Sequence, residues 1–553
     1  MAKFARLVVH GLAMASLARP SVALSDHFDV REATVDGVHG ALLARLTTCR
    51  EVVSAFIARI EHFNPILNAV ISLNPDALLD ADQMDGQIAS GNMTGALFCI
   101  PVLLKDNYNA VGMNTTGGCL DLANNRPLVD APTVKALKRA GAIILGKTNL
   151  HELALEGLTV SSLGGQTVNP YDLTRTPGGS SGGAGAAIAA SFAVVGTGTD
   201  TVNSLRSPAS AGSLFSFRPT RGLISRVGVI PVSYTQDVVG AFARNLQDLA
   251  VAMTVMVSVG FDPRDNATAL MATEIMHTDH SRCLLGGSLK GLRLGLVDGF
   301  FDHTSSPETP PVDDIMAGMV SQLTAAGAEV VNITETIYNS VAISAALDVQ
   351  VYEYRELLDT YLAGEDLSGE PRPKSFKELY RNGSGEFLVI PSQHAFIEAA
   401  FRSSTSNTSY FTAQRGIQNL TQALKATFAR DKLDALIYPE QKNLVVTVSS
   451  QSQAGRNGIL ASLTGSPVVT VPAGFSSPTE DALLGVPVGM EILGQPWTEC
   501  LLLNIARHVS DLVPVRRIPA FANMTVETKV FDSVPVITPN SANIAPAYPV
   551  GVF

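Results

Sequence analysis

The feature that most constrains the fold is a glycine- and serine-rich segment followed by a run of small residues. Residues 176–183 read TPGGSSGG, and residues 184–190 read AGAAIAA. Consecutive glycines let the backbone adopt turns that are closed to other residues, and they let main-chain N–H groups approach a ligand. A helix built almost entirely of alanine can pack closely behind such a loop. The segment therefore predicts a tight turn backed by a densely packed helix.

The pattern alone leaves two interpretations of this segment open. It satisfies the G-x-S-x-G pattern of a nucleophile elbow at residues 178–182, but an elbow follows an apolar strand and residues 172–177 read DLTRTP. The other interpretation is a flexible glycine–serine turn without chemistry. A phosphate-binding loop is excluded, because the Lys-Ser/Thr pair of a Walker A sequence is missing.

The rest of the chain alternates apolar strands with helices. Apolar runs at 97–104, 292–297 and 468–471 predict strands, and the helical spacing of apolar residues at 38–62 predicts a helix. Alternation of this kind favours an α/β fold with a mixed sheet. With 46% hydrophobic and 16% charged residues, the 553-residue chain can bury a large core. No linker divides it, so we expect a single large domain.

The charge and the residue spacing argue against several kinds of partner. The net charge is −11 and Lys and Arg form no block, which is unlike proteins that bind nucleic acid or anionic membranes. Metal-site spacings such as H-E-x-x-H and C-x-x-C are missing, so we expect neither a metal nor another cofactor. The ten histidines, among them His151, His394 and His508, are assigned no role.

The N-terminus has the pattern of a secretory signal. Lys3 and Arg6 precede the apolar stretch Leu7–Ala18, which is too short to span a bilayer, and residues 21–23 (SVA) offer a cleavage site. We therefore predict a signal peptide at 1–23, no transmembrane segment and a secreted protein. The alternative is a disordered or docked N-terminal segment.

Eight N-x-S/T sequons support export and predict a glycoprotein. They lie at Asn92, Asn114, Asn266, Asn332, Asn382, Asn407, Asn419 and Asn523. The five cysteines are too few for a disulfide scaffold. In an exported chain Cys99 and Cys119 could pair, and the alternative is five buried thiols.

Several further segments occur in an order that resembles the amidase-signature family, which includes fatty acid amide hydrolase, bacterial amidases and the A subunit of the glutamyl-tRNA amidotransferase. They are IPVLLKD (100–106), GAIILGKTN (141–149), NPY (169–171), the glycine–serine loop, GTDTVNSLR (198–206), and the segments at 218–222, 228–231, 235–240, 464–467 and 486–494. The resemblance covers about residues 36–512, and the combined pattern is far more specific than any single piece.

The resemblance implies the amidase-signature fold, in which helices cover both faces of a mixed, twisted sheet. That domain would occupy residues 24–512, and an irregular tail would follow at 513–553. The resemblance also implies a catalytic triad in which Ser204 is the nucleophile, Ser180 relays protons across a preceding cis peptide bond, and Lys105 is the base. Ser204 follows Ser180 by 24 residues, as in the family.

Lys105 can act as a base only in its neutral form, and burial lowers the pKa of a lysine. Lys105 ends the apolar run 100–104, so burial is expected. The alternative is an ion pair with Asp106 at the end of a strand. The family also implies an oxyanion hole made by the backbone N–H groups of residues 201–204, namely Thr201, Val202, Asn203 and Ser204. Four residues are expected to orient these loops, with ordinary loop hydrogen bonding as the alternative: Ser181, Thr199, Asp200 and Arg206.

The chain departs from the family pattern at two places. Val202-Asn203 stands where the family has Gly-Gly, although valine strongly resists a positive φ. Either this turn needs no positive φ at residue 202, or it is rebuilt. The second departure is Cys99, where glycine commonly precedes the Ile-Pro pair.

These observations predict a serine hydrolase that cleaves the carboxamide bond of a small-molecule substrate through an acyl-enzyme, with esterase side activity. One alternative is an amidotransferase-type subunit that acts with a partner, and another is a non-catalytic binding homologue. A homodimer is expected from the family. We expect the residues that select the substrate within 340–430, a helix-rich stretch without recognisable chemistry.

Overall fold

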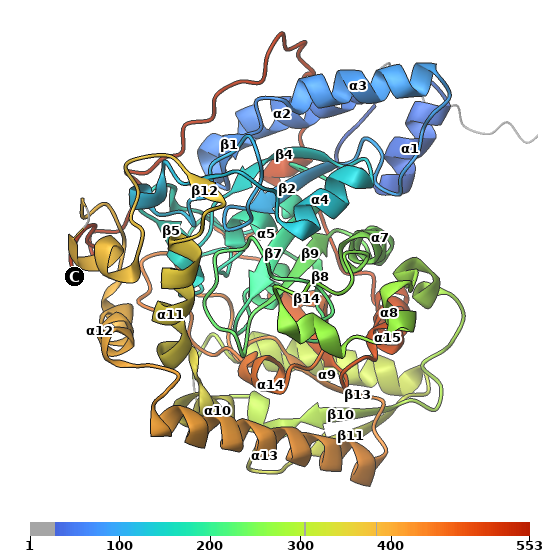
Figure 1. Cartoon of the computed structure of the whole chain (residues 1–553). Coiled ribbons are helices and arrows are strands. Elements are labelled where there is room, and N and C mark those ends of the chain that lie inside the picture. The colour runs from blue at the N-terminus through green and yellow to red at the C-terminus, as the bar shows by residue number, and fades with distance from the viewer. Residues whose placement is uncertain (1–27, 303–305, 383) are drawn as a thin grey trace, which may run out of the picture.

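The computed structural model describes residues 28–302, 306–382 and 384–553 (Figure 1). The expected signal peptide at 1–23 lies outside the described residues. The remainder forms one α/β unit around a mixed sheet, which confirms the predicted fold class. Helices cover both faces of that sheet (Figure 1).

Eleven strands of the described chain form the main sheet. Their order is β1 (Val70–Leu73), β4 (Ile143–Thr148), β2 (Pro101–Lys105), β7 (Val195–Asp200), β9 (Val238–Ala243), β8 (Phe215–Arg218), β14 (Val468–Phe475), β15 (Pro487–Leu493), β13 (Ala435–Pro439), β10 (Arg293–Val297) and β11 (Glu329–Ile333). Two short pairs lie apart from it: β3 (Arg126–Pro127) with β12 (Leu367–Ser368), and β5 (Val160–Ser161) with β6 (Gly165–Gln166).

The direction of the strands places the chemistry-bearing residues at one edge. β2 is parallel to β7, with Leu103 opposite Gly196, and the central strands β7 to β13 are antiparallel neighbours. The carboxyl ends of parallel neighbours lie at the same edge of a sheet. The last residues of β2 and β7, including Lys105 and Thr199, therefore lie side by side.

The helices have the following bounds: α1 (Val35–Leu43), α2 (Cys49–Leu67), α3 (Ala77–Ala89), α4 (Pro132–Arg139), α5 (Gly182–Ala189), α6 (Arg206–Ala211), α7 (Leu246–Val257), α8 (Thr273–Met276), α9 (Pro310–Ala325), α10 (Ser340–Leu347), α11 (Gln350–Leu362), α12 (His394–Arg402), α13 (Thr408–Asp431), α14 (Ile459–Thr464) and α15 (Glu499–Leu512). The small residues of α5 let this fully buried helix lie directly against β7, β2 and β9.

The helix predicted over 38–62 is divided into α1 and α2. Thr48 caps α2 by accepting a hydrogen bond from the N–H of Glu51, whose carboxylate accepts from the N–H of Thr48. This capping box satisfies backbone donors that a new helix start leaves free. The apolar spacing continues across the break, because both helices bury one face against the same core.

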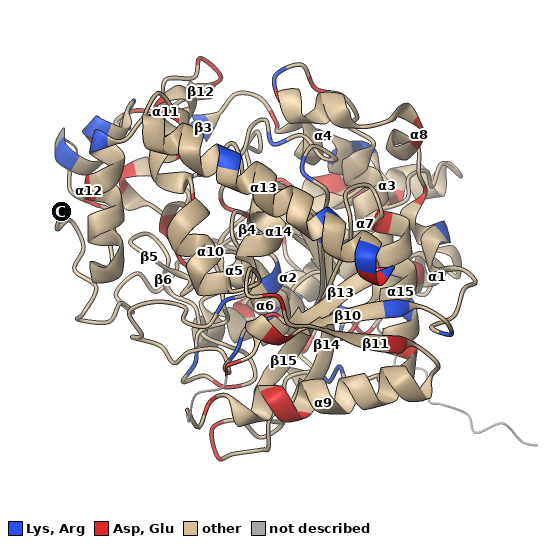
Figure 2. Ribbon diagram, turned by 90° about the horizontal axis from the view of Figure 1, so that it is seen from below, with Lys and Arg blue, Asp and Glu red and all other residues tan. Residues whose placement is uncertain are grey.

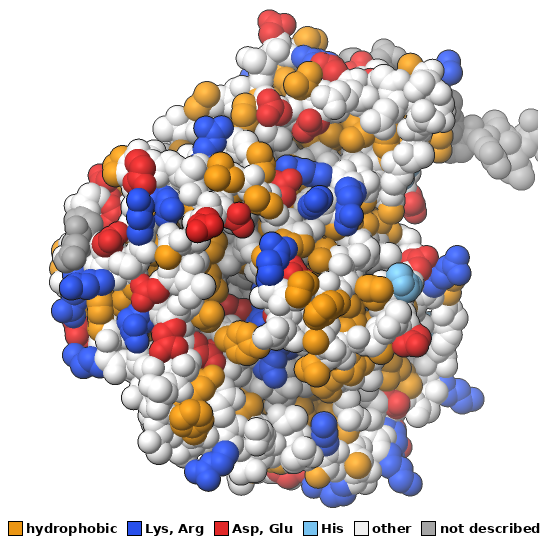
Figure 3. All heavy atoms as spheres, in the orientation of Figure 1, with side chains coloured by type: hydrophobic (Ala, Val, Ile, Leu, Met, Phe, Trp, Pro, Cys, Tyr) orange, Lys and Arg blue, Asp and Glu red, His pale blue; other side chains and the backbone are white. Residues whose placement is uncertain are grey.

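Four helices, α10 to α13, follow one another within residues 340–431, and α13 runs along the lower side of the molecule in Figure 1. Acidic and basic residues share α11, α12 and α13, whereas α10 has neither (Figure 2). Arg402 pairs with Glu398 on α12, and Arg430 pairs with Asp431 on α13. The face shown in Figure 3 likewise mixes acidic, basic and hydrophobic side chains.

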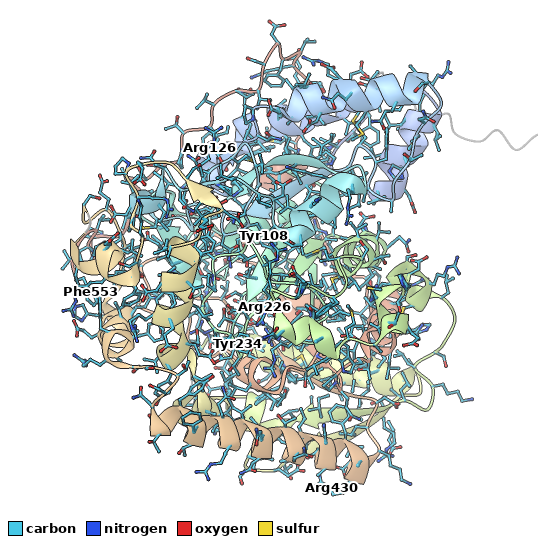
Figure 4. The ribbon with its side chains drawn as sticks, viewed as in Figure 1. Tyr108, Arg126, Arg226, Tyr234, Arg430 and Phe553 are labelled. Atoms are coloured by element: carbon cyan, nitrogen blue, oxygen red, sulfur yellow. A yellow bond between two sulfur atoms is a disulfide. The ribbon has the colours of Figure 1, made fainter. Side chains whose placement is uncertain are left out.

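The C-terminal segment, residues 513–553, lies along the surface of the domain. In the described structure it contains no α-helix, and its regular structure is a 3-10 turn at Phe521–Asn523 and a single bridge from Val550 to Leu388. Hydrogen bonds attach this segment to the domain; for example, the N–H of Gln166 donates to the carbonyl of Asn543 at 2.7 Å. Phe553 packs beside α12, with the Arg381 guanidinium 5.7 Å from its ring centre (Figure 4).

The expected pairing of Cys99 with Cys119 is wrong. Cys99 forms a disulfide with Cys49, and Cys283 forms a second one with Cys500. Cys119 is a buried free thiol, packed in a separate cluster of apolar side chains. Proximity in the sequence therefore misled the prediction, because Cys49, at the start of α2, is brought to Cys99 by the packing of that helix.

Candidate active site

Lys105 ends β2 with its side chain fully buried. Its Nζ donates hydrogen bonds to Ser180 Oγ at 2.8 Å and to Thr199 Oγ1 at 2.7 Å. The alternative ion pair with Asp106 is wrong, because Asp106 pairs with Lys147 at 3.1 Å. No carboxylate of the described residues forms an ion pair with Lys105, so its amine meets only hydroxyl groups.

Burial sets the protonation of this amine. It lowers the pKa of Lys105 to about 7, against the opposing fields of Asp200 and Asp237, which favour the charged form. A lysine in water has a pKa near 10.4 and is almost never neutral at pH 7. The burial expected from the sequence is therefore observed, and a large fraction of Lys105 is neutral at neutral pH.

The glycine–serine loop is an ordered, buried structure rather than a flexible turn. Gly178 has a φ of +70°, and a Cβ there would lie 2.7 Å from Ser207 Oγ, so the position requires glycine. Thr159 Oγ1 donates to the carbonyl of Gly178 at 2.7 Å and accepts from the N–H of Gly182 at 3.1 Å. The peptide bond between Gly179 and Ser180 is cis.

The loop is not a nucleophile elbow. Residues 172–177 contain turns and a single bridge residue but no strand, whereas an elbow follows a strand directly. The Ser180 hydroxyl is buried against Lys105, away from any opening. Such a position suits the transfer of a proton better than attack on a substrate.

Ser204 lies in the turn that follows β7, beside a cavity of about 430 Å³. Its side chain lines that cavity, and its hydroxyl makes no hydrogen bond to any described residue. The carbonyl of Ser204 accepts from the N–H of Ser181 at 3.3 Å, which joins the two serine segments. Of the two serines, Ser204 is thus the one that a ligand in the cavity can reach.

The turn before Ser204 leaves backbone donors free. The N–H groups of residues 201–204 donate no hydrogen bond to any described residue. Neither Val202 nor Asn203 has a positive φ, so this turn does not need the glycines of the family pattern. The carbonyl of Val202 is held by Ser462 Oγ at 2.7 Å and by the Arg206 guanidinium. Four free donors next to a nucleophile can stabilise an oxyanion.

The other departure, Cys99, does occupy a glycine-like conformation. Its φ is +59°, in the left-handed region that few residues other than glycine adopt. Cys99 lies just before β2, and its side chain is fully buried in the disulfide with Cys49.

A buried ionic network supports the turn. Arg206 donates to Asp200 Oδ1 and Oδ2, each at 3.0 Å, and to Glu491 Oε2 at 2.9 Å, while Arg218 contacts Asp200 Oδ1 at 2.6 Å. Burial raises the pKa of Asp200, but the two guanidinium groups outweigh it and hold that pKa at about 2. Asp200 also accepts from the N–H of Leu205 at 3.0 Å, so the network fixes the backbone on both sides of Ser204.

The remaining residues that were expected to support the loops differ in their contacts. Ser181 Oγ bridges to the backbone of Thr199, with distances of 3.2 Å to its carbonyl and 3.3 Å to its nitrogen. Thr199 accepts directly from Lys105, and its hydroxyl also accepts from Asn107 Nδ2 at 3.1 Å. Thr199 is therefore closer to the base than the sequence indicated.

Sequence reasoning missed two carboxyl groups beside the turn. Asp237 Oδ1 accepts from Thr201 Oγ1 at 2.6 Å, and Glu440 Oε1 accepts from Asn203 Nδ2 at 2.7 Å. Glu440 directly follows the buried strand β13, and a charged residue in that position was the signal that could have identified it.

The cavity is lined by α10, the start of α11 and the 453–459 segment. Its polar side chains include Ser340, Ser344, Asp348, Gln350 and Gln453. Arg456 and Glu156 form an ion pair across 2.9 Å at its wall. Of the stretch 340–430, residues 340–350 contribute the lining residues.

The described residues 28–302, 306–382 and 384–553 lack two other kinds of feature. No group of three or more His, Cys, Asp or Glu side chains in that part of the chain could hold a metal ion. Among the described helices, none has the length and apolar character needed to cross a membrane.

Comparison with known sequences points to one family. The Amidase family model matches residues 51–503. A probable amidase of Arabidopsis thaliana is 31% identical over 519 residues, which cover 90% of this chain and 94% of that protein. The A subunit of the glutamyl-tRNA(Gln) amidotransferase of Alkalilimnicola ehrlichii is 30% identical over 506 residues, which cover 88% of this chain and 99% of that protein.

Comparison with solved structures points to the same family. The native peptide amidase from Stenotrophomonas maltophilia matches with a TM-score of 0.79 and 32% identity, covering 89% of this chain and 99% of that one. An amidase family protein from Bacillus anthracis matches with a TM-score of 0.74 and 26% identity, and the match covers 89% of this chain and 92% of that one. With a family model that spans most of its length and relatives that align almost end to end, the chain belongs to the amidase-signature family.

Proposed function

We propose that this protein hydrolyses linear carboxamides, with Ser204 as nucleophile, Ser180 as proton relay and Lys105 as general base. The observation that carries the proposal is the buried amine of Lys105, 2.8 Å from Ser180 Oγ, in a site where Ser204 faces the cavity. A neutral amine hydrogen-bonded to a hydroxyl is the arrangement that activates a serine nucleophile without histidine.

In the proposed reaction, Lys105 takes the proton of Ser180 while Ser180 takes the proton of Ser204. Ser204 Oγ then attacks the amide carbon, and the N–H groups of residues 201–204 receive the negative charge on the carbonyl oxygen. The relay returns the proton to the leaving nitrogen, which departs as an amine or ammonia. Water attacks the acyl-enzyme through the same relay and releases the carboxylic acid.

The substrate is proposed to be a linear amide with polar groups near the scissile bond, with esters hydrolysed as a side activity. The cavity mixes hydroxyl, amide and charged side chains, so it offers hydrogen bonds to a polar acyl group. The likeness to a peptide amidase supports a peptide-like amide as the first compound to test.

The test compares wild type with Ser204→Ala on a panel of peptide amides, aryl amides and esters, by amine and ammonia release. Wild type should hydrolyse members of the panel, and the variant should lose at least about 10³-fold in kcat. The matched control is Ser207→Ala, since Ser207 is a buried serine three residues further on whose hydroxyl has no partner among the described residues. Full activity of Ser204→Ala would overturn the proposal.

The panel also separates the other candidate functions. Ammonia release from free glutamine, with no hydrolysis of other amides, would favour an amidotransferase-type subunit. If wild type hydrolyses no member of the panel and a fluorophosphonate probe leaves Ser204 unlabelled, the protein is a non-catalytic homologue.

We also propose that the protein is exported and glycosylated. Six of the seven sequon asparagines whose side chains are described are exposed, and Asn407 is half-buried. Two disulfides are typical of proteins that fold in an oxidising compartment. Both observations support export without identifying the compartment.

A further inference from the structure

Asn203, one of the two residues that replace the family's glycines, has a side chain that points away from the cavity into the protein. Its Nδ2 donates to Glu440 Oε1 at 2.7 Å, and both side chains are fully buried. Glu440 is itself fixed by its backbone, since its N–H donates to the carbonyl of Gly489 at 3.0 Å and its carbonyl accepts from the N–H of Asn457 at 3.1 Å. The partner of Asn203 is therefore attached to the central sheet.

The other side of the turn is equally constrained. A Cβ on Gly458 would lie 2.2 Å from the carbonyl oxygen of Val202 and 2.6 Å from Asn203 Cβ, so the backbone of residue 458 lies directly against the turn. Ser462 Oγ, one turn further along α14, donates to the same carbonyl at 2.7 Å. Asn203 thus fills a space that a glycine would leave open, between the backbone of Gly458 and the carboxyl group of Glu440.

We infer that Glu440 is a positioning residue, which holds the Asn203 side chain and thereby orients the backbone N–H groups that precede Ser204. The inference rests on the proposed role of Ser204. Glu440 is not among the residues that line the cavity, so its effect reaches the substrate through Asn203.

The protonation state of Glu440 matters to this contact. Burial and the nearby carboxylate of Glu491 on β15 raise the pKa of Glu440 to about 8, against the hydrogen bond from Asn203 and the fields of Arg206 on α6 and of Arg456, which lower it. Because the hydrogen bond from Asn203 lowers this pKa, it is stronger with the carboxylate than with the neutral acid, and both forms accept it.

The experiment measures kcat, KM and the rate at which a fluorophosphonate probe labels Ser204, in Glu440→Ala, Asn203→Ala and the double variant. Each single variant should lower kcat and the labelling rate about 10-fold or more with little change in KM, because displaced oxyanion donors act on the transition state. The double variant should be no slower than the slower single variant. Multiplicative losses would show that the two side chains act independently and would overturn the inference.

Glu440→Gln separates positioning from mere filling of space. The amide oxygen of glutamine can accept from Asn203, so kcat at pH 7 should stay within about 3-fold of wild type, whereas Glu440→Met, which fills the space without an acceptor, should be as slow as Glu440→Ala. The matched control is Glu499→Gln, since Glu499 is another buried glutamate whose pKa is raised by burial, bound to the N–H of Thr220. This control should keep the wild-type kcat.

The outcomes remain distinguishable. If Glu440→Ala does not fold, Glu440→Gln and Asn203→Ala still decide the matter. If Ser204→Ala keeps its activity, the proposed function fails and the inference fails with it. If Ser204→Ala is inactive while Glu440→Ala keeps wild-type kcat, or if Glu440→Gln is as slow as Glu440→Ala, the inference alone fails.

Discussion

Replacing Lys105 with methionine should abolish activity and change stability in a way that depends on pH. Methionine has a similar length and no charge, so the variant keeps the buried volume while removing the amine. It also removes the hydrogen bonds to Ser180 and Thr199, at a cost of about 1–3 kcal/mol for the Ser180 hydroxyl that is left unpaired, while Thr199 keeps its hydrogen bond from Asn107. That cost does not vary with pH, whereas the cost of burying the amine does.

The magnitude follows from the pKa of Lys105, which burial lowers from 10.5 to about 7. Between these values the unfolded chain binds a proton that the folded protein does not, so wild-type stability is complete above pH 10.5 and falls as the pH approaches 7. Burying the Lys105 amine lowers the free energy of unfolding by about 4 kcal/mol at pH 7.5 and by between about 1 and 2 kcal/mol at pH 9.5. Below pH 7 the amine is protonated in both the folded and the unfolded state, so this decrease no longer changes with pH.

The assay is urea unfolding of wild type and Lys105→Met between pH 7.5 and 9.5. The free energy of unfolding of wild type relative to the variant should rise by about 2–3 kcal/mol over this range. Titration of other groups, Glu440 included, occurs in both proteins and cancels in the difference. The same substitution at exposed Lys135 on α4 measures the effect of merely removing an ammonium group. A difference that stays flat with pH would refute the burial argument for Lys105.

Three further predictions concern the base, the ionic network and export. The value of kcat/KM should rise with pH through an apparent pKa near 7, since only neutral Lys105 is a base, and a pH–rate profile checks this. Arg206→Lys should lower the free energy of unfolding by about 3–5 kcal/mol in urea titrations, because one ammonium cannot satisfy both Asp200 and Glu491. Protein secreted from a eukaryotic host should gain electrophoretic mobility after N-glycosidase treatment, and unchanged mobility would contradict glycosylation.

Much of the fold and the residues of the proposed triad could be identified from the sequence, because the relevant signals are local. Apolar runs mark the strands, and Lys105, Ser180 and Ser204 each lie in a short segment of distinctive composition. The predicted disulfide of Cys99 was wrong because its pairing is not a local property of the sequence. Its partner Cys49 lies 50 residues away and meets it only through the docking of α2, which no local pattern encodes.

The surroundings of the nucleophile show the same limit. Val202 and Asn203 were recognisable as a departure, but their meaning depends on Glu440, which is 237 residues away from Asn203 in the sequence. The sequence also left open whether the turn needed a positive φ, since that depends on backbone geometry. The strained position is instead Cys99, with a φ of +59°, where the family commonly has glycine.

Of the two buried groups Lys105 and Glu440, only Lys105 limits the working pH of the proposed enzyme. Lys105 must be neutral, so activity is lost as the pH falls below about 7. The hydrogen bond from Asn203 lowers the pKa of Glu440, so this contact persists when Glu440 ionises and its loss sets no alkaline limit. The profile of kcat should therefore rise through one apparent pKa near 7, and Glu440→Gln should leave that rise in place. A variant of Glu440 that moves the rise would show that the two groups titrate as one coupled system rather than as a separate base and positioning residue.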